Sequence, residues 1–196
     1  MSDIKSALEI ALEKTQNLGE PTEEERLKWK YGPRGEQLAA KYLKEDVNLV
    51  AELSHYDDVA KGYITGKAAE ILIRSIDLPK NDYIKKNNRR AMDGVKVLKT
   101  DKASVENVYS KMRQLFNHYL DQGEQQRKAA YQELKREFEA KVQQALQQQM
   151  NPLMGTKIDV EREPQFQQEW RRVLGQMDAQ YQALLNEHRN KLLSLR

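Results

Sequence analysis

The chain has 196 residues, with 33 basic and 30 acidic side chains and a formal net charge of +3. Val, Ile, Leu and Phe make up about 22% of it, near the level of about 20% below which highly charged chains stay unfolded. A large compact core is therefore not expected, and the high content of Ala, Glu, Lys, Leu and Arg is typical of long helices. The absence of Cys excludes disulfides, thiolate nucleophiles and thiolate metal sites.

The sequence predicts a cytoplasmic protein that is not inserted in a membrane. Its first residues lack a basic stretch followed by an apolar one, and the most apolar window, residues 68–76, contains Glu70 and Arg74. The small charge excess predicts little attraction of the whole molecule to nucleic acid. A basic surface that binds a partner would therefore be local.

Residues 1–100 predict a first domain of five or six short helices packed together. Ser2 can cap an amphipathic first helix. Thr22 and Glu25 then have the spacing of a capping box, in which each residue bonds the backbone of the other. We expect Gly32-Pro33 to end the helix that begins there, because Pro lacks the N–H that the helix needs.

Four further helical segments follow in this domain. One begins directly after that break, and a brief apolar helix covers residues 47–53. Asp57 or Asp58 can cap a longer helix that runs up to Pro79. The last segment, residues 81–98, turns a row of apolar side chains inward.

Residues 101–196 form a second region of different composition, which holds 16 of the 18 Gln residues. Between residues 101 and 150 there is no Pro and a single Gly, and apolar residues recur at steps of three and four. This pattern predicts one helix about 70 Å long. Gly123 is its weak point, where the helix can kink or break, because an interior Gly costs about 1 kcal/mol relative to Ala.

A second long helix is predicted for residues 164–196. Asn151-Pro152 should end the preceding helix, and Ile158 and Val160 alternate as in a short extended piece. Pro164 suits the first turn of the new helix. Its apolar seam has coiled-coil spacing and consists of Phe166, Trp170, Val173, Met177, Tyr181, Leu184, His188, Leu192 and Leu195.

The two long helices, residues 101–150 and 164–196, should fold back on each other as an antiparallel hairpin. The shorter helix cannot cover the longer one. We expect the uncovered part, near Val105 to Tyr119, to pack on the first domain or on a second chain. The fold class is therefore all-α, a small helical bundle followed by a long helical hairpin.

Two motifs suggest ligand sites, but each lacks the parts that its chemistry needs. Glu52 and His55 have the spacing of one half of a di-iron carboxylate site, but the other two His residues have Leu at the required offset. Residues 62–67 superficially resemble a phosphate-binding loop. The spacing is one residue short, Ala68 follows the Lys, and the pattern is helical. We expect neither metal nor nucleotide, and interpret these glycines as sites of close helix packing.

Residues 80–102 carry a net charge of +5, the strongest local charge feature. On the predicted helix, one exposed side could neutralise phosphates, with Asn87 and Asn88 adding hydrogen bonds. The alternative is a solvated face paired with the acidic residues 20–25. The basic side chains on this candidate surface for anions or nucleic acid are Lys85, Lys86, Arg89 and Arg90.

Several stretches resemble a family of bacterial proteins of unknown function. The resemblance spans most of the chain, and its motifs are structural rather than chemical, so it implies no activity, cofactor or catalytic residue. The stretches that carry it are residues 4–13, Ile76-Asp77-Leu78-Pro79, Leu115 to Leu120, and Ile158 to Val160 with Pro164 to Phe166.

No catalytic set can be assembled from the sequence, and no cofactor is expected. The leading hypothesis is a non-enzymatic scaffold or adaptor that self-associates or binds another protein through the seam. The second is binding of nucleic acid or an anionic surface through the basic helix around residues 85–90. The third is a holdase-like chaperone whose hairpin grips unfolded chains. The sequence leaves open the partner, the oligomeric state and whether the hairpin closes within one chain.

Overall fold

The computed structural model describes residues 21–45, 47–148 and 159–195, which form α-helices and one 3-10 turn, with no strand in these ranges. The all-α prediction is therefore confirmed. The helix predicted to follow Ser2 and the predicted helix end at Asn151-Pro152 lie outside the described residues. The chain divides into two compact units between Leu72 and Ile73.

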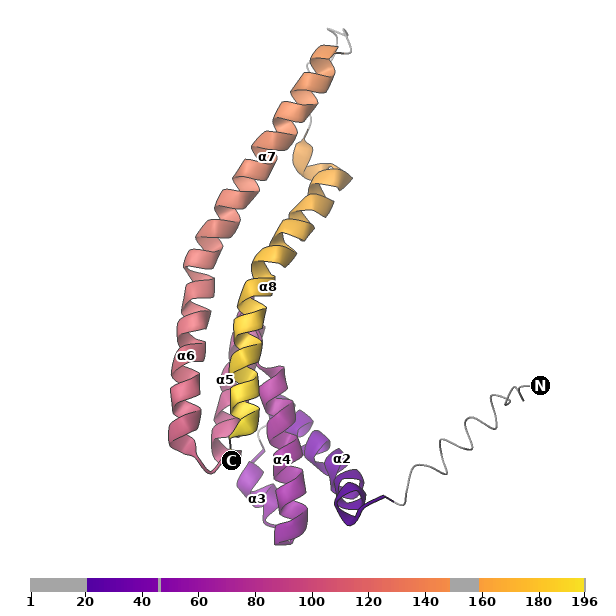
Figure 1. Cartoon of the computed structure of the whole chain (residues 1–196), viewed down its shortest axis with the longest axis vertical. Helices are drawn as coiled ribbons and strands as arrows, with labels where there is room; N and C mark the ends of the chain where they lie inside the picture. Colours follow the sequence, from indigo (N-terminus) through magenta and orange to yellow (C-terminus); the bar gives the residue numbers. More distant parts are fainter. Residues whose placement is uncertain (1–20, 46, 149–158, 196) are drawn as a thin grey trace, which may run out of the picture. The chain divides into compact units, whose positions relative to one another are not determined.

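The first unit begins with α2 (Glu23–Lys44), which starts at the predicted capping box (Figure 1). The Glu25 N–H donates to Thr22 Oγ1 (3.3 Å), and the Thr22 N–H donates to Glu25 Oε2 (2.8 Å). The expectation that Gly32-Pro33 ends this helix is wrong, because α2 continues to Lys44 with Pro33 inside it. An interior Pro costs about 3 kcal/mol, so tertiary packing must offset that loss.

That packing comes from the part of α2 that follows Pro33. Gly35, Leu38 and Ala39 are buried there. A Cβ atom added to Gly35 would lie only 2.6 Å from the carbonyl oxygen of Ile64, on α4 (Asp58–Ser75). Gly35 therefore allows the two helices to approach closely, and the apolar area buried beside it favours a continuous helix.

The glycines of α4 do not have the role that the sequence predicted for them. Open space lies beside both Gly62 and Gly66, so neither is the point of close helix packing. The helix itself begins as predicted, since Asp57 accepts a hydrogen bond from the Ala60 N–H (2.8 Å). It ends at Ser75 rather than at Pro79.

The short helix α3 (Leu49–Leu53) lies between α2 and α4 in the sequence. Asn48 caps it, because its side-chain oxygen accepts hydrogen bonds from the N–H groups of Val50 and Ala51. Leu49 and Leu53 are buried, which confirms the brief apolar helix predicted here.

The second unit contains a long antiparallel hairpin in which α8 runs back along α6 and α7 (Figure 1). Short segments pack beside it, and α5 contacts α6. The elements are α5 (Asp82–Leu98), α6 (Lys102–Leu120), α7 (Gln122–Gln148), the 3-10 turn η1 (Val160–Arg162) and α8 (Pro164–Ser194). The sequence predicts a domain boundary at residue 100, whereas the division between compact units precedes α5.

The segment predicted as one helix, residues 101–150, is two helices that meet at Asp121. Gly123, the predicted weak point, lies two residues further on and is buried. A Cβ atom there would lie 3.1 Å from both Tyr181 Oη and Arg127 Nη1. The interruption therefore coincides with close packing of α8 against the start of α7.

The connection before α8 differs from the short extended piece that was predicted. Val160 begins a 3-10 turn, which the Asp159 carboxylate caps by accepting from the Glu161 N–H (3.3 Å). Ile158 lies outside the described residues. Pro164 occupies the first turn of α8, as predicted.

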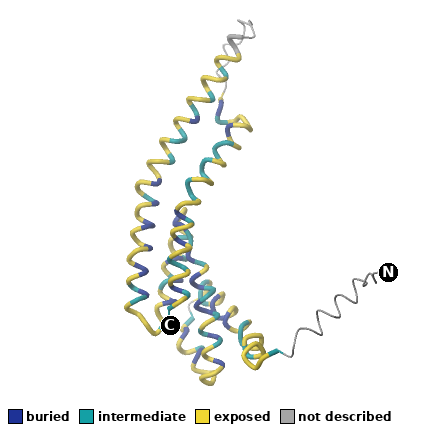
Figure 2. The backbone as a smooth tube through the Cα atoms, in the orientation of Figure 1, coloured by how far each residue is buried: buried dark blue, intermediate teal, exposed yellow. Residues whose placement is uncertain are grey.

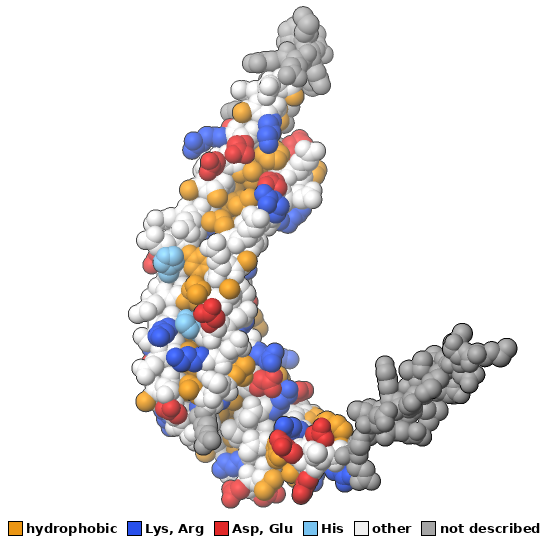
Figure 3. Space-filling view, in the orientation of Figure 1, with side chains coloured by type: hydrophobic (Ala, Val, Ile, Leu, Met, Phe, Trp, Pro, Cys, Tyr) orange, Lys and Arg blue, Asp and Glu red, His pale blue; other side chains and the backbone are white. Residues whose placement is uncertain are grey.

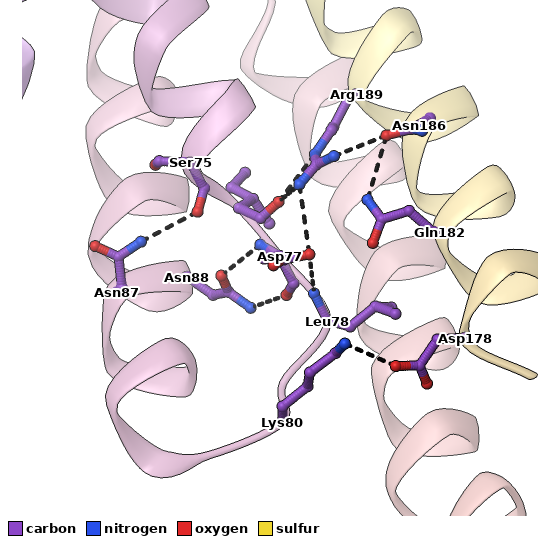
Figure 4. A network of polar contacts seen from close by, with 11 residues as sticks. Ser75, Asp77, Leu78, Lys80, Asn87, Asn88, Asp178, Gln182, Asn186 and Arg189 are labelled. Carbon is purple, nitrogen blue, oxygen red and sulfur yellow. Dashed lines mark hydrogen bonds and ion pairs between the residues drawn. The ribbon is translucent and has the colours of Figure 1, made fainter. Parts of the chain in front are cut away.

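A polar network holds the loop between α4 and α5 against α8 (Figure 4). Asn88 of α5 is 3% exposed; its side chain accepts from the Asp77 N–H (2.8 Å) and donates to the Asp77 carbonyl (2.5 Å). Arg189 donates two hydrogen bonds to the Ile76 carbonyl, and Lys80 pairs with Asp178 (2.7 Å). The Ile76-Asp77-Leu78-Pro79 stretch is thus a fixed turn.

Candidate functional site

A groove of about 890 Å³ runs along the hairpin between α6, the start of α7 and α8. Leu115, His118 and Gln126 line one wall, and Met177 and Leu184 line the other. In the space-filling view, hydrophobic side chains follow the hairpin with histidines beside them (Figure 3). The remaining lining residues are Lys111, Gln114, Gln176, Gln180, Tyr181 and His188.

The groove is poor in charge. Lys111 is its only Lys, Arg, Asp or Glu, although these residues make up 32% of the chain. Loss of charged residues and the presence of Met and aromatic side chains distinguish the centres of protein interfaces from other surfaces. The lining therefore shares its low content of charged residues with the centres of protein interfaces.

The antiparallel arrangement orders these residues along the groove. Lys111 of α6 lies near His188 of α8, and His118 Nδ1 lies 3.0 Å from Tyr181 Oη near the middle. Gln126 and Gln176 lie at the far end, because α8 runs opposite to α6 and α7. The single formal charge is thus at one end of the groove.

Tyr181 belongs to a packed polar cluster behind the groove. Its ring packs edge to face on Tyr119 (5.1 Å between centroids), whose hydroxyl donates to Asp178 Oδ1 (3.1 Å). The Arg127 guanidinium lies 4.3 Å from the Tyr119 ring centroid and donates to the Tyr119 carbonyl (3.1 Å). Burial, followed by the Asp178 carboxylate, raises the pKa of Tyr119. These contacts fix the wall where α6 meets α7.

His188 is half-buried at the charged end of the groove. Burial lowers its pKa below the usual value of 6.5, and the nearby Lys111 and Lys191 charges lower it further, whereas the Glu187 carboxylate opposes them. A group with this depression is neutral at pH 7. The wall that contains His188 is therefore uncharged near neutral pH.

The residues of the predicted seam on α8 differ in burial, and its role as a partner-binding surface stays a prediction. Phe166, Tyr181 and Leu192 are buried, but Leu184 is 46% exposed and Leu185 is fully buried in its place. A straight helix drifts relative to a seven-residue repeat, so the buried stripe moves to a neighbouring position. Trp170, Val173, Met177, His188 and Leu195 are half-buried.

Sequence reasoning missed the wall that α6 and α7 contribute. Lys111, Gln114 and Gln126 gave no signal, because they are polar residues on an expected solvent face. Nothing in the sequence marks His118 as part of a groove. The Gln-rich composition of residues 101–196 was the one sign of an uncharged surface in this region.

The predicted basic surface on α5 is divided by the helix geometry. Lys85 and Arg89 line a second cleft, between α5 and α6, whereas Lys86 is exposed outside it and Arg90 is half-buried. The expectation for the two Asn residues is wrong. Asn88 is bonded to the Asp77 backbone and Asn87 donates to the Ser75 carbonyl (3.1 Å), so both serve the turn.

Three neighbouring basic residues have partners within their own unit. Lys96 pairs with Glu106 (3.0 Å), Lys85 with Asp82 (3.0 Å), and Lys99 donates to the Leu195 carbonyl (2.5 Å). Binding of nucleic acid through this helix stays a prediction.

The other two candidate motifs, Glu52 with His55 and residues 62–67, have positions that are explained without a ligand. Glu52 pairs with Lys41 (3.3 Å), and His55 is exposed. Residues 62–67 lie within α4, not in a loop. Among residues 21–45, 47–148 and 159–195, no group of three His, Asp or Glu side chains could hold a metal ion, and no helix could cross a membrane.

Fold and groove together define an all-α protein whose principal structural feature is a helical hairpin. Residues 50–194 match the profile of a protein family described as "Family of unknown function (DUF6657)", and the chain belongs to this family. The expected resemblance to a family of unknown function is confirmed, and the match covers every stretch cited for it except residues 4–13. Bacterial origin stays a prediction. No curated protein and no solved structure matches the chain.

Proposed function

We propose that this protein is a non-enzymatic helical scaffold that pairs with a second copy of itself through the hairpin groove. The observation that carries the proposal is the groove lining, which has one formal charge and an exposed Leu184 at its centre. Removal of an exposed Leu side chain from water is favourable, and a groove with one formal charge has little charge to desolvate. In a self-associated pair, the occupant of this groove is the hairpin of a second copy, which has the same length.

The position of Lys111 favours a second copy as the occupant. A dimer with two-fold symmetry uses the same surface on both chains. An axis through the middle of the groove would place Lys111 of each chain opposite the Gln126 and Gln176 end of the other. No like charges would then meet, and the Leu184 side chains would lie near each other at the axis.

The non-enzymatic part of the proposal is supported by the roles of the acid–base side chains. His118 contacts Tyr181, Asp178 pairs with Lys80, and Asp57 caps α4. These groups hold helices and loops together, which accounts for their positions without catalysis.

Sedimentation equilibrium of the full chain tests the proposal. We expect a dimer for the wild type and a monomer for Leu184→Lys, because two ammonium groups would be brought together at the axis. Val97→Lys is the matched control, since Val97 of α5 is 48% exposed and lies outside the groove lining. A monomeric wild type at about 100 µM, or a dimeric Leu184→Lys variant, would contradict it.

A further inference from the structure

A second cleft, of about 520 Å³, lies between α5 and α6, away from the hairpin groove. Its volume is within the range of about 300–1,000 Å³ that is usual for small-molecule sites. Part of its lining is apolar, from Pro79, Met92, Tyr109 and Phe116. The rest is strongly charged, whereas the lining of the hairpin groove contains one formal charge, Lys111.

The apolar wall is fixed before any ligand arrives. Tyr109 is 2% exposed, and its hydroxyl donates to the Met92 carbonyl (2.8 Å), which joins α6 to α5. Phe116 is 9% exposed beside it, and the buried Asn88 is held by the Asp77 backbone. A rigid wall of this kind reduces the entropy that binding would cost.

The charges of the cleft do not cancel. Its lining contains four cations, from Lys85, Arg89, Lys96 and Arg113, and two carboxylates, from Asp93 and Glu106. Glu106 accepts from both Lys96 (3.0 Å) and Arg113 (2.5 Å), so one carboxylate serves two cations. These two cations lower the pKa of Glu106, which keeps it ionised. The cleft thus keeps a positive excess.

Arg89 is the cation best placed to meet a ligand. It lines the cleft, and its guanidinium makes no hydrogen bond or ion pair with any residue that the structure describes. Lys85, one helical turn away, contacts Asp82, whose carboxylate is 97% exposed, so that pair is weak. A planar guanidinium binds carboxylate and phosphate groups through two parallel hydrogen bonds.

From these observations we propose that the cleft binds a small organic anion, with its carboxylate or phosphate on Arg89 and its apolar body against Met92 and Phe116. The positive excess selects the anionic group, and the fixed wall selects the body. A single macromolecular anion such as RNA would instead contact exposed cations on both sides of α5, including Lys86 outside the cleft.

Calorimetric titration of the full chain with 1-naphthyl phosphate tests this inference. We expect saturable binding of one molecule per chain, weaker binding of 1-naphthol or inorganic phosphate alone, and weakening with salt. A parallel titration with 1-naphthoate identifies the preferred anionic group, and saturable binding of either anion supports the proposal. Absence of saturable binding for both anions would overturn it.

Matched charge removals on one helix distinguish the cleft from a general basic surface. Arg89→Gln should weaken binding of 1-naphthyl phosphate at least tenfold, whereas Lys86→Gln should change it less than twofold. Both residues are exposed, so circular dichroism should show folded variants. An equal loss of affinity for 1-naphthyl phosphate in the two variants would overturn the cleft site. RNA binding that both substitutions weaken equally would also overturn it. Leu184→Lys should bind the probe normally, which separates this test from that of the dimer.

Discussion

The base and the tip of the hairpin are stabilised in different ways. At the base, α6 and the C-terminal half of α8 bury aliphatic side chains completely, such as Met112, Leu185 and Leu192. At the tip, α7 and the N-terminal half of α8 meet through aromatic rings, with Tyr131 and Phe138 packed edge to face on Phe166. Burial is accordingly dense along α6 and sparse along α7 (Figure 2).

The different packing of base and tip follows from the number of helices and loops that surround each end of the hairpin. The base has α5 beside it and the turn at Asp77 fixed to α8, so apolar residues there are enclosed on several sides. The tip is a pair of helices with one shared stripe. Large rings at that stripe bury more area per residue and gain from edge-to-face contact, by about 0.5–1.5 kcal/mol per pair. The packing at the base should therefore determine the free energy of global unfolding. The tip should open in local unfolding that leaves the base folded.

The largest effect is expected from a cavity at the base. Leu185 is fully buried, so Leu185→Ala should lower the free energy of unfolding by about 3 kcal/mol. Chemical denaturation measures it. The neighbouring Leu184→Ala is the matched control and should cost much less in a monomeric state, because Leu184 is 46% exposed. Equal losses would show that the base is not enclosed as described.

A cavity at the tip should cost less globally. Phe166 is 2% exposed and packs on Tyr131 and Phe138 of α7. Because the tip should open locally, Phe166→Ala should cost less in global unfolding than the roughly 3 kcal/mol or more usual for a buried Phe→Ala change. Hydrogen exchange should rise along α7 and remain slow in α6. If exchange rose equally in both helices, the tip and base would form one cooperative unit and the comparison would fail.

A smaller loss is expected from the turn that fixes the base. Asn88→Ala removes two hydrogen bonds to the Asp77 backbone and leaves buried polar groups without partners, at a cost of about 1–2 kcal/mol. Thermal unfolding provides the measurement. Asn87→Ala removes one bond, to the Ser75 carbonyl, and should cost less. The opposite order would contradict the account of the turn.

The smallest effect concerns pH. Burial lowers the pKa of His188 in the folded chain below 6.5, so the unfolded chain takes up a proton first as the pH falls. Its contribution to stability is present above pH 6.5 and is lost as the pH falls through the lowered pKa. Unfolding of His188→Gln should depend less on pH between 7.5 and 5. An unchanged pH dependence in His188→Gln would contradict this account.

Local signals in the sequence predicted most of the helices. Thr22 and Asp57 both cap the helices that they precede, because each side chain bonds backbone within three residues. Pro33 could not be predicted correctly in this way. Its cost is offset by packing of Gly35 on Ile64, a residue distant in the sequence.

The candidate sites depend even more than the helices do on contacts between residues that are distant in the sequence. The predicted seam contains Leu184 rather than Leu185, because the spacing alone cannot distinguish these neighbours. The packing of α8 on α6 determines which of the two is buried. The basic residues of α5 were visible, but their division between cleft and open surface depends on where Arg113 and Glu106 of α6 lie. The composition and the apolar spacing of residues 101–196 predicted the hairpin. The packing of its helices on one another determines which side chains form its surfaces.

Cross-linking through a single cysteine tests the proposed dimer most directly, because the chain has no Cys of its own. The two-fold pairing places Leu184 of both copies near the axis, so Leu184→Cys should form a disulfide-linked dimer rapidly under mild oxidation. Val97→Cys, at a residue of similar exposure outside the groove, should remain monomeric on denaturing gels. Equal cross-linking of both variants, or none at Leu184→Cys, would contradict the pairing of two chains through the groove.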